Sequence, residues 1–160
     1  MPGSGKSTVG VILAKYLGFD FVDTDVLIQI RNNRSLQDIV DRDGYLELRR
    51  IEEEVIVGLD IKQHVIATGG SAVYSDKAMQ HLGPRGIVVF LNVDLDTLKK
   101  RVHDYETRGL AKRPDQTVDD LFAERYALYR KYADVEIDCT GLNHEQVAEQ
   151  IVKEVKRIVG

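Results

Sequence analysis

The chain has 160 residues, of which 43% are hydrophobic and 30% are charged, and it carries a net charge of −4 with one cysteine, Cys139. This length and apolar content suit one compact domain. The negative charge argues against general affinity for nucleic acid or anionic membranes. A single cysteine excludes an internal disulfide. No apolar run approaches the roughly 18 residues of a membrane-spanning helix. We therefore expect a cytoplasmic protein that holds any anionic ligand through local arginines.

The first eight residues match all but the opening position of the phosphate-binding pattern G-x-x-x-x-G-K-[ST]. Small residues let successive backbone N–H groups curl around a phosphate, and the following helix adds its dipole. The alternative is a Gly/Ser loop before a helix that happens to begin with lysine. We favour the phosphate loop because an apolar helix follows at once. Lys6 would reach the β- and γ-phosphates and Ser7 would ligate magnesium, with the rest of the loop supplied by Gly3, Ser4, Gly5 and Thr8.

The pattern of apolar residues predicts helices and strands in alternation. Residues 6–17 form the first predicted helix, with apolar residues three and four apart and Gly18 as its C-cap. The remaining predicted helices cover 26–31, 35–42, 45–59, 76–82, 94–102, 117–130 and 143–158. Predicted strands cover 19–22, 64–67, 86–92 and 135–138. Residues 103–116 are polar and lack periodicity, which predicts a mobile loop.

This alternation predicts an α/β fold: a three-layer parallel sheet with helices on both faces, of the P-loop NTPase type, in a single domain over residues 1–160. A phosphate loop lies between a strand and a helix, and that strand would precede Met1 in the centre of the sheet. Its absence would leave two neighbouring strands unpaired. We therefore expect the native product to extend about ten residues upstream, a typical strand with its lead-in.

Several motifs stand together in a fixed order: Pro2-Gly3-Ser4-Gly5-Lys6-Ser7-Thr8, Asp23-Thr24-Asp25, Arg49-Arg50-Ile51-Glu52, Thr68-Gly69-Gly70 and Leu128-Tyr129-Arg130. Together they resemble the shikimate kinases, small P-loop kinases of the nucleoside-monophosphate-kinase type, over essentially the whole chain. The resemblance implies transfer of the γ-phosphate of ATP to the 3-hydroxyl of shikimate, with magnesium, for aromatic amino-acid biosynthesis. Its substrate-binding helices would cover about residues 24–59.

Asp23 and Asp25 follow a predicted strand and face the phosphate loop. The resemblance implies that Asp23 supports the magnesium and its waters, while Asp25 grips substrate hydroxyls and is the candidate base. A carboxylate bonded to the attacking hydroxyl would orient it and could accept its proton late in the reaction. The alternative is a turn in which Asp25 caps the next helix.

Two arginines and a glycine complete the implied acceptor site. Arg49 matches the family's arginine for the shikimate carboxylate, where a planar fork binds two oxygens; its alternative is an ion pair with Glu53. Gly70 matches a position that touches shikimate, and Arg130 matches a second carboxylate-binding arginine. The resemblance also implies that the acid Glu52 lies near this pocket. This sequence departs from the family at Ser71, where many relatives have a third glycine.

The loop over about 103–116 corresponds to the lid of the family, which closes over ATP and excludes water. Arg113-Pro114 resembles the lid's Arg-Pro, so we favour Arg113 as the catalytic lid arginine that contacts the phosphates, with Arg108 as its rival. Arg101 matches the arginine that packs over adenine; alternatively it belongs to a solvated basic face.

The favoured hypothesis is a monomeric, ATP- and Mg²⁺-dependent shikimate kinase in which Lys6, Asp25 and Arg113 are catalytic. Another small-molecule P-loop kinase, of the gluconate or nucleoside-monophosphate type, is the near alternative. A non-catalytic relative that binds nucleotide is the third.

Overall fold

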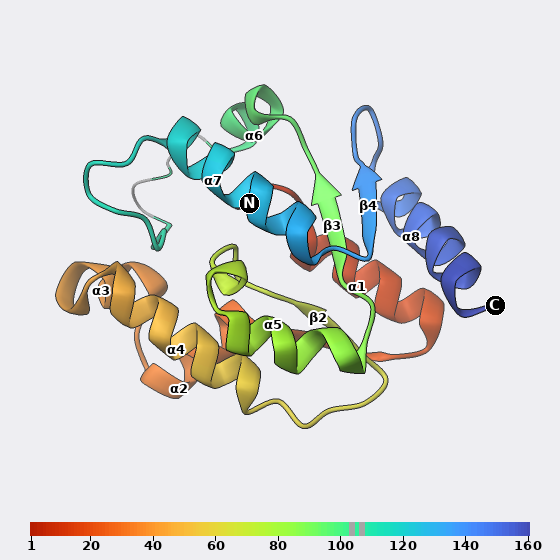
Figure 1. Cartoon of the computed structure of the whole chain (residues 1–160), viewed down its shortest axis with the longest axis horizontal. Helices are drawn as coiled ribbons and strands as arrows, with labels where there is room; N and C mark the ends of the chain where they lie inside the picture. The colour runs from red at the N-terminus through yellow and green to blue at the C-terminus, as the bar shows by residue number, and fades with distance from the viewer. Residues whose placement is uncertain (103–104, 106–107) are drawn as a thin grey trace.

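The computed structural model describes residues 1–102, 105 and 108–160. Figure 1 shows the course of the chain. Its first half runs α1 (Lys6–Leu17), β1 (Asp20–Asp23), α2 (Thr24–Asn32), α3 (Leu36–Asp43), α4 (Tyr45–Val57), β2 (His64–Ala67), the 3₁₀ turn η1 (Ala72–Tyr74) and α5 (Asp76–Leu82). The second half runs η2 (Gly83–Arg85), β3 (Val89–Asn92), α6 (Leu95–Arg101), α7 (Val118–Tyr132), β4 (Val135–Asp138) and α8 (His144–Val159).

The predicted helices are confirmed, and several of their ends are fixed by side-chain caps. Ser35 and Thr117 each form a capping box with the aspartate three residues later, and Asn143 forms one with Gln146. Asp23, not Asp25, caps α2, because its carboxylate accepts from the backbone N–H groups at the start of that helix. Asp25 is thereby left free for another role.

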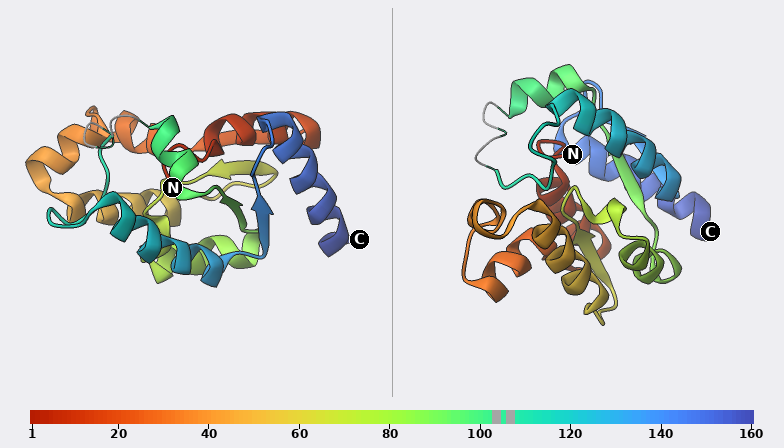
Figure 2. Two further views of the ribbon diagram at one scale, coloured as in Figure 1. Left: turned by 90° about the horizontal axis from the view of Figure 1, so that it is seen from above. Right: turned by 60° about the vertical axis from the view of Figure 1, so that its left-hand side comes forward.

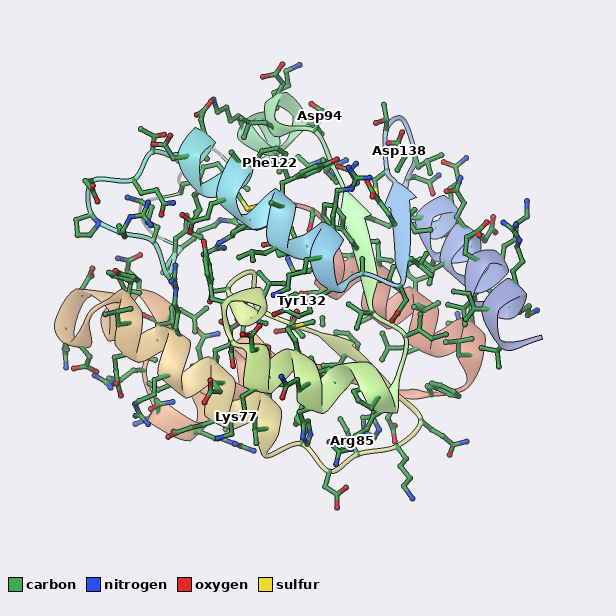
Figure 3. The ribbon with its side chains drawn as sticks, in the orientation of Figure 1. Lys77, Arg85, Asp94, Phe122, Tyr132 and Asp138 are labelled. Atoms are coloured by element: carbon green, nitrogen blue, oxygen red, sulfur yellow. The ribbon has the colours of Figure 1, made fainter. Side chains whose placement is uncertain are left out.

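All paired strands are parallel, which confirms the predicted α/β class, but they form two pairs and not one sheet. β1 pairs with β2 and β3 pairs with β4. Figure 3 labels Asp94, which follows the carboxyl end of β3, and Asp138, the last residue of β4, at the same end of that pair. The predicted strand 86–92 begins only at Val89, because η2 occupies the chain to Arg85 and Gly86–Val88 lie outside the ladder.

Helices cover both faces of the strands. In the left view of Figure 2, α1 lies on one side of the strands, while α5 and α7 lie on the other. The largest core cluster joins α1, α7 and α8 to β3 and β4, with Leu13, Leu91, Leu121 and Ile151 among its buried members. A second cluster binds α2, α3 and α4 to one another through residues such as Ile28, Ile39, Leu48 and Val55.

An apolar cavity of about 350 Å³ lies between the two strand pairs. Residues of β2 and β3 border it, together with Leu13 from α1 and Met79 from α5. The described strands do not bridge this gap, which explains why the sheet is divided. A strand ahead of Met1 in the middle of the sheet stays a prediction.

Candidate active site

The phosphate loop borders a polar pocket of about 700 Å³. Gly3 and Gly5 have φ of 81° and 89°, a region that favours glycine, and a Cβ on Gly3 would come within 2.6 Å of the Val102 side chain. The Lys6 ammonium donates to the Met1 carbonyl at 2.9 Å and so folds over the loop. The Ser4 hydroxyl also donates to Met1 and braces the loop from inside. Lys6, Ser7, Thr8 and Pro2 line the pocket with both glycines.

Ser7 and Asp23 lie side by side where the loop meets the end of β1. The Ser7 hydroxyl donates to Asp23 Oδ2 at 2.5 Å, while Asp23 Oδ1 accepts from the backbone N–H of Asp25 at 2.9 Å. A hydroxyl beside a carboxylate offers the hard oxygen ligands that Mg²⁺ prefers. Among the described residues, no group of three or more His, Cys, Asp or Glu side chains is arranged to hold a metal ion. An ion at Ser7 and Asp23 would therefore take its other ligands from phosphate and water.

Asp25 and Glu52 meet across Gly69. A Cβ on Gly69 would overlap Glu52 Oε1 and lie 2.6 Å from Asp25 Oδ1, so the two carboxylates approach the same point. Burial and, to a lesser extent, the neighbouring Asp23 raise the pKa of Asp25. Burial raises the pKa of Glu52 to about 7, although a hydrogen bond from Ser71 opposes the shift. Such shifted carboxylates are typical of functional sites.

Lys6 is the cation of this acidic cluster. Burial lowers the pKa of Lys6, and the opposing charges of Asp25 and Asp23 partly restore it. The site therefore holds a desolvated ammonium near three carboxylates, those of Asp23, Asp25 and Glu52. A buried charge of this kind is stable only when its partners stay in place.

Arg49 and Arg125 converge on one backbone oxygen. Arg49 donates to the Ala111 carbonyl at 3.0 Å and Arg125 donates to the same oxygen at 3.1 Å. The Tyr74 ring supports both guanidinium groups, which lie 3.5 Å and 5.5 Å from its centroid. The Nε atoms of both arginines are buried without a partner. Two cations with spare donors therefore share a single neutral acceptor.

Arg125, Gly70 and Ala111 line the pocket, whereas Arg49 does not. Arg49 is joined to the pocket wall by its hydrogen bond to the Ala111 carbonyl. The Arg125 side chain is 1% exposed. A Cβ on Gly70 would lie 2.7 Å from the Arg125 guanidinium and 3.2 Å from the Tyr129 hydroxyl, so only glycine leaves this space free. Tyr129 fixes the turn by donating to the Gly70 carbonyl at 2.7 Å.

Arg130, the expected second arginine of the acceptor site, is not among the residues that line the pocket. Arg130 points out of the pocket, where its guanidinium is exposed and pairs with Glu136 at 3.1 Å. Successive helical positions differ by about 100°, and Arg125 lies on the buried face of α7 with Leu121 and Tyr129. An arginine four residues from Leu121 and from Tyr129 interrupts an otherwise apolar stripe. That signal could have identified Arg125 from the sequence.

The described part of the predicted lid separates its two arginines. Arg108 lines the pocket, whereas Arg113 points away from it and pairs with Glu124 at 3.1 Å. The described structure therefore favours Arg108 over Arg113, because Glu124 holds the Arg113 guanidinium outside the pocket. Residues 103, 104, 106 and 107 of the predicted lid lie outside the described residues.

Hydrogen bonds at Gly109 and Ala111 attach the lid segment to α3, α4 and α7. The Gly109 N–H donates to the Gln37 side chain at 2.7 Å, and Ala111, 3% exposed, receives the two arginines. Arg101 also lines the pocket and donates to the Gly3 carbonyl of the phosphate loop at 3.3 Å. In the described part of the chain, no helix is long and apolar enough to cross a membrane.

Comparison with known proteins identifies the family. The family model described as "Shikimate kinase" matches residues 2–156. A shikimate kinase of Thermodesulfovibrio yellowstonii is 38% identical over 98% of this chain and 91% of its own length. One of Mycobacterium avium is 39% identical over 95% of this chain and 88% of its own.

Solved structures agree. A shikimate kinase from Acinetobacter baumannii in complex with shikimate superposes with a TM-score of 0.89 at 30% identity, over 97% of this chain and 88% of that one. A shikimate kinase from Aquifex aeolicus gives 0.84 at 32% identity, over 98% and 92%. The matches cover almost the whole chain, including the phosphate loop and the polar pocket. The chain belongs to the shikimate kinase family.

Proposed function

We propose that this protein transfers the γ-phosphate of ATP to the 3-hydroxyl of shikimate, with the polar pocket as its active site. Family membership supports a kinase that acts on shikimate. The observation that carries the residue assignment is the convergence of Arg49 and Arg125 on the Ala111 carbonyl. A carboxylate offers a full negative charge and two oxygens at a point where Ala111 offers one neutral oxygen.

The donor half of the site is the phosphate loop. Backbone N–H groups from Gly3 to Ser7 and the N-terminus of α1 favour bound phosphate. On this assignment the Lys6 ammonium leaves the Met1 carbonyl and moves to the β- and γ-phosphates, with Arg101 near the base of the nucleotide. Arg108 approaches the phosphates from the lid. Positioning and charge neutralisation of this kind supply most of the catalysis in phosphoryl transfer.

Ser7 and Asp23 would hold Mg²⁺ together with the ATP phosphates. Their adjacent oxygens fit that ion, which commonly takes one or two protein ligands and completes its shell with phosphate and water. When bound, the ion would neutralise charge on the phosphates. Asp23 also caps α2, so the same carboxylate ties the metal site to the helix that carries Asp25.

Asp25 orients the acceptor hydroxyl. In the transfer, the hydroxyl oxygen forms its bond to the γ-phosphorus while the bond from that phosphorus to the bridging oxygen of ADP breaks. The hydroxyl proton passes to the Asp25 carboxylate, and ADP keeps the electron pair of the broken bond. Asp25 lines the pocket between Lys6 and Gly69, which is the position that this role requires.

The arginine assignment is tested with a matched pair on one helix. Arg125→Lys replaces a two-point donor by a point charge and should raise the KM for shikimate by about 30-fold, equivalent to about 2 kcal/mol. Arg130→Lys should leave that KM unchanged. Both variants should bind ATP normally, as measured by ADP release at varied shikimate and by nucleotide titration. Equal effects of the two substitutions would contradict the assignment.

A substrate panel tests the activity itself. ADP release with shikimate, gluconate and a nucleoside monophosphate should show turnover with shikimate alone. Turnover with another acceptor and none with shikimate would overturn the proposal. A monomer in the cytoplasm stays a prediction from the sequence, and analytical ultracentrifugation would test the first part of it.

A further inference from the structure

Tyr74 contacts both arginines of the acceptor site but does not line the polar pocket. The Arg49 guanidinium lies over its ring, 3.5 Å from the centroid, and the Arg125 guanidinium lies 5.5 Å from the same centroid. Arg125 is among the residues that line the pocket, and Tyr74 is not. Any effect of this ring on a bound substrate must therefore pass through the two arginines.

The two guanidinium groups need support because like charges repel. Both donate to the Ala111 carbonyl, so they lie close together on one neutral oxygen. Burial lowers the pKa of Arg49, and the charge of Arg125 lowers it further. The face of an aromatic ring is negative and attracts a cation. One ring that contacts both groups therefore offsets part of their repulsion and part of their lost hydration.

The Tyr74 ring is itself held in place through its hydroxyl. That hydroxyl, on η1, donates to Glu124 Oε1 on α7. Glu124 Oε2 accepts from the Arg113 guanidinium at 3.1 Å and from the Gln116 amide at 3.2 Å. The two oxygens of Glu124 are therefore divided between the ring and the segment that follows Ala111. This segment, the ring and α7 form one connected set of contacts around the two arginines.

We propose that Tyr74 is a positioning residue of the acceptor site, whose ring holds Arg49 and Arg125 in the orientation that binds a carboxylate. A guanidinium that stacks on a ring keeps its N–H donors available, so stacking fixes the group without using its hydrogen bonds. This inference rests on the proposed function and adds to it a residue that does not contact substrate. Loss of the ring should therefore weaken recognition of the shikimate carboxylate and leave the transfer step unchanged.

Tyr132, labelled in Figure 3, provides a matched control. Its hydroxyl donates to Asp76, and the Lys131 ammonium lies 4.6 Å from its ring centroid, which repeats the carboxylate and cation contacts of Tyr74. This contact also joins α7 to the segment that follows β2, but Tyr132 does not touch the polar pocket. A purely structural role for Tyr74 would give the same result as this control.

The experiment measures kcat and the KM for shikimate at saturating MgATP for the wild type, Tyr74→Leu, Tyr74→Phe and Tyr132→Leu. Tyr74→Leu removes the ring and should raise the KM about tenfold, because only the longer contact of Arg49 with Tyr45, at 5.2 Å, remains. Its kcat should stay within about twofold of the wild type. Tyr74→Phe keeps the ring and loses one hydrogen bond, so its KM should rise by less than about threefold. Tyr132→Leu should keep the wild-type KM.

A double-mutant cycle tests whether Tyr74 acts through Arg49. In an Arg49→Met background, the ring has lost the guanidinium that lies closest to it, and only the contact with Arg125, at 5.5 Å, remains. Tyr74→Leu should then lower kcat/KM for shikimate by less than about threefold. A loss as large as in the wild-type background would overturn the proposed route.

The outcomes separate the two proposals. A wild type without shikimate-dependent ADP release contradicts the proposed function, and the inference falls with it. In an active wild type, the role of Tyr74 alone is overturned if Tyr74→Leu lowers kcat without raising the KM, if Tyr74→Phe is as impaired as Tyr74→Leu, or if Tyr132→Leu raises the KM equally. Thermal unfolding identifies any variant that does not fold. If Tyr74→Leu is one, Tyr74→Met takes its place, because the flexible Met side chain adapts to irregular gaps.

Discussion

Two hollows among the described residues, the apolar cavity between the strand pairs and the polar pocket at the phosphate loop, differ in the side chains that border them. The cavity between the strand pairs is bordered mainly by apolar side chains such as Leu13 and Leu91. The pocket at the phosphate loop is bordered by Lys6, Asp23, Asp25, Glu52 and Arg125, of which Glu52 and Arg125 are buried. Burying apolar groups favours folding, whereas burying unpaired charges opposes it. Substitutions in the cavity should therefore change stability, and substitutions in the pocket should change catalysis.

The largest effect is expected at Lys6. Lys6→Met removes the ammonium that would neutralise the transferring phosphate, and kcat should fall by roughly 10²- to 10³-fold. The change removes an ammonium that burial disfavours but also removes the cation beside Asp25 and Asp23. Because these two effects oppose each other, the midpoint of thermal unfolding should change little. ADP release and calorimetry measure the two effects. A variant that lost activity only because it unfolded would remove the distinction between the hollows.

Leu13 provides the reverse case. Leu13→Ala enlarges the apolar cavity and should lower the free energy of unfolding by about 2–4 kcal/mol, measured by urea titration. The KM for shikimate should stay at the wild-type value. Val89→Ile, on β3 at the other side of the cavity, is the matched filling variant and should add up to about 1 kcal/mol. A change in KM with either variant would show that the cavity and the pocket are coupled.

The lid arginines sharpen the comparison within the pocket. Arg108→Ala should lower kcat by about 30-fold, because Arg108 lines the same pocket as the phosphate loop. Arg113→Ala should have little effect on kcat, since its guanidinium is already paired with Glu124. Steady-state ADP release compares the two. A larger loss in Arg113→Ala would mean that the lid rearranges when ATP binds and exchanges one arginine for the other.

The predictable parts of the fold are those that short-range patterns determine. The apolar spacing of residues 6–17 and the capping boxes at Ser35, Thr117 and Asn143 gave helices close to their observed ends. The strands were also recognisable as apolar runs. Which strands pair with which was not, because pairing depends on which strands the fold brings within hydrogen-bonding distance.

The predictable parts of the site follow the same rule. Lys6, Ser7, Asp23, Asp25 and Gly70 lie in contiguous motifs, and all of them line the pocket. Arg130 and Arg113 were predicted as site residues because of an adjacent tyrosine or proline, but in this structure their side chains pair with glutamates outside the pocket. Arg125 was missed since its role depends on the face of α7 that is buried. The Ala111 carbonyl, a backbone group, leaves no trace in the sequence.

The smallest effect is a pH dependence of stability that separates the hollows once more. The pKa of Glu52 is raised by burial from its ordinary value of 4.5 to about 7 in the folded chain. Between these values the folded state binds the proton and the unfolded state does not, so stability is fully present below pH 4.5 and falls as the pH rises toward 7. The slope should approach about 1.4 kcal/mol per pH unit.

Glu52→Gln should remove that slope, whereas Leu13→Ala should lower stability equally at every pH. Urea titrations from pH 4.5 to 8 measure both, and parallel curves for the wild type and Glu52→Gln would mean that the Glu52 carboxyl is already ionised in the folded chain.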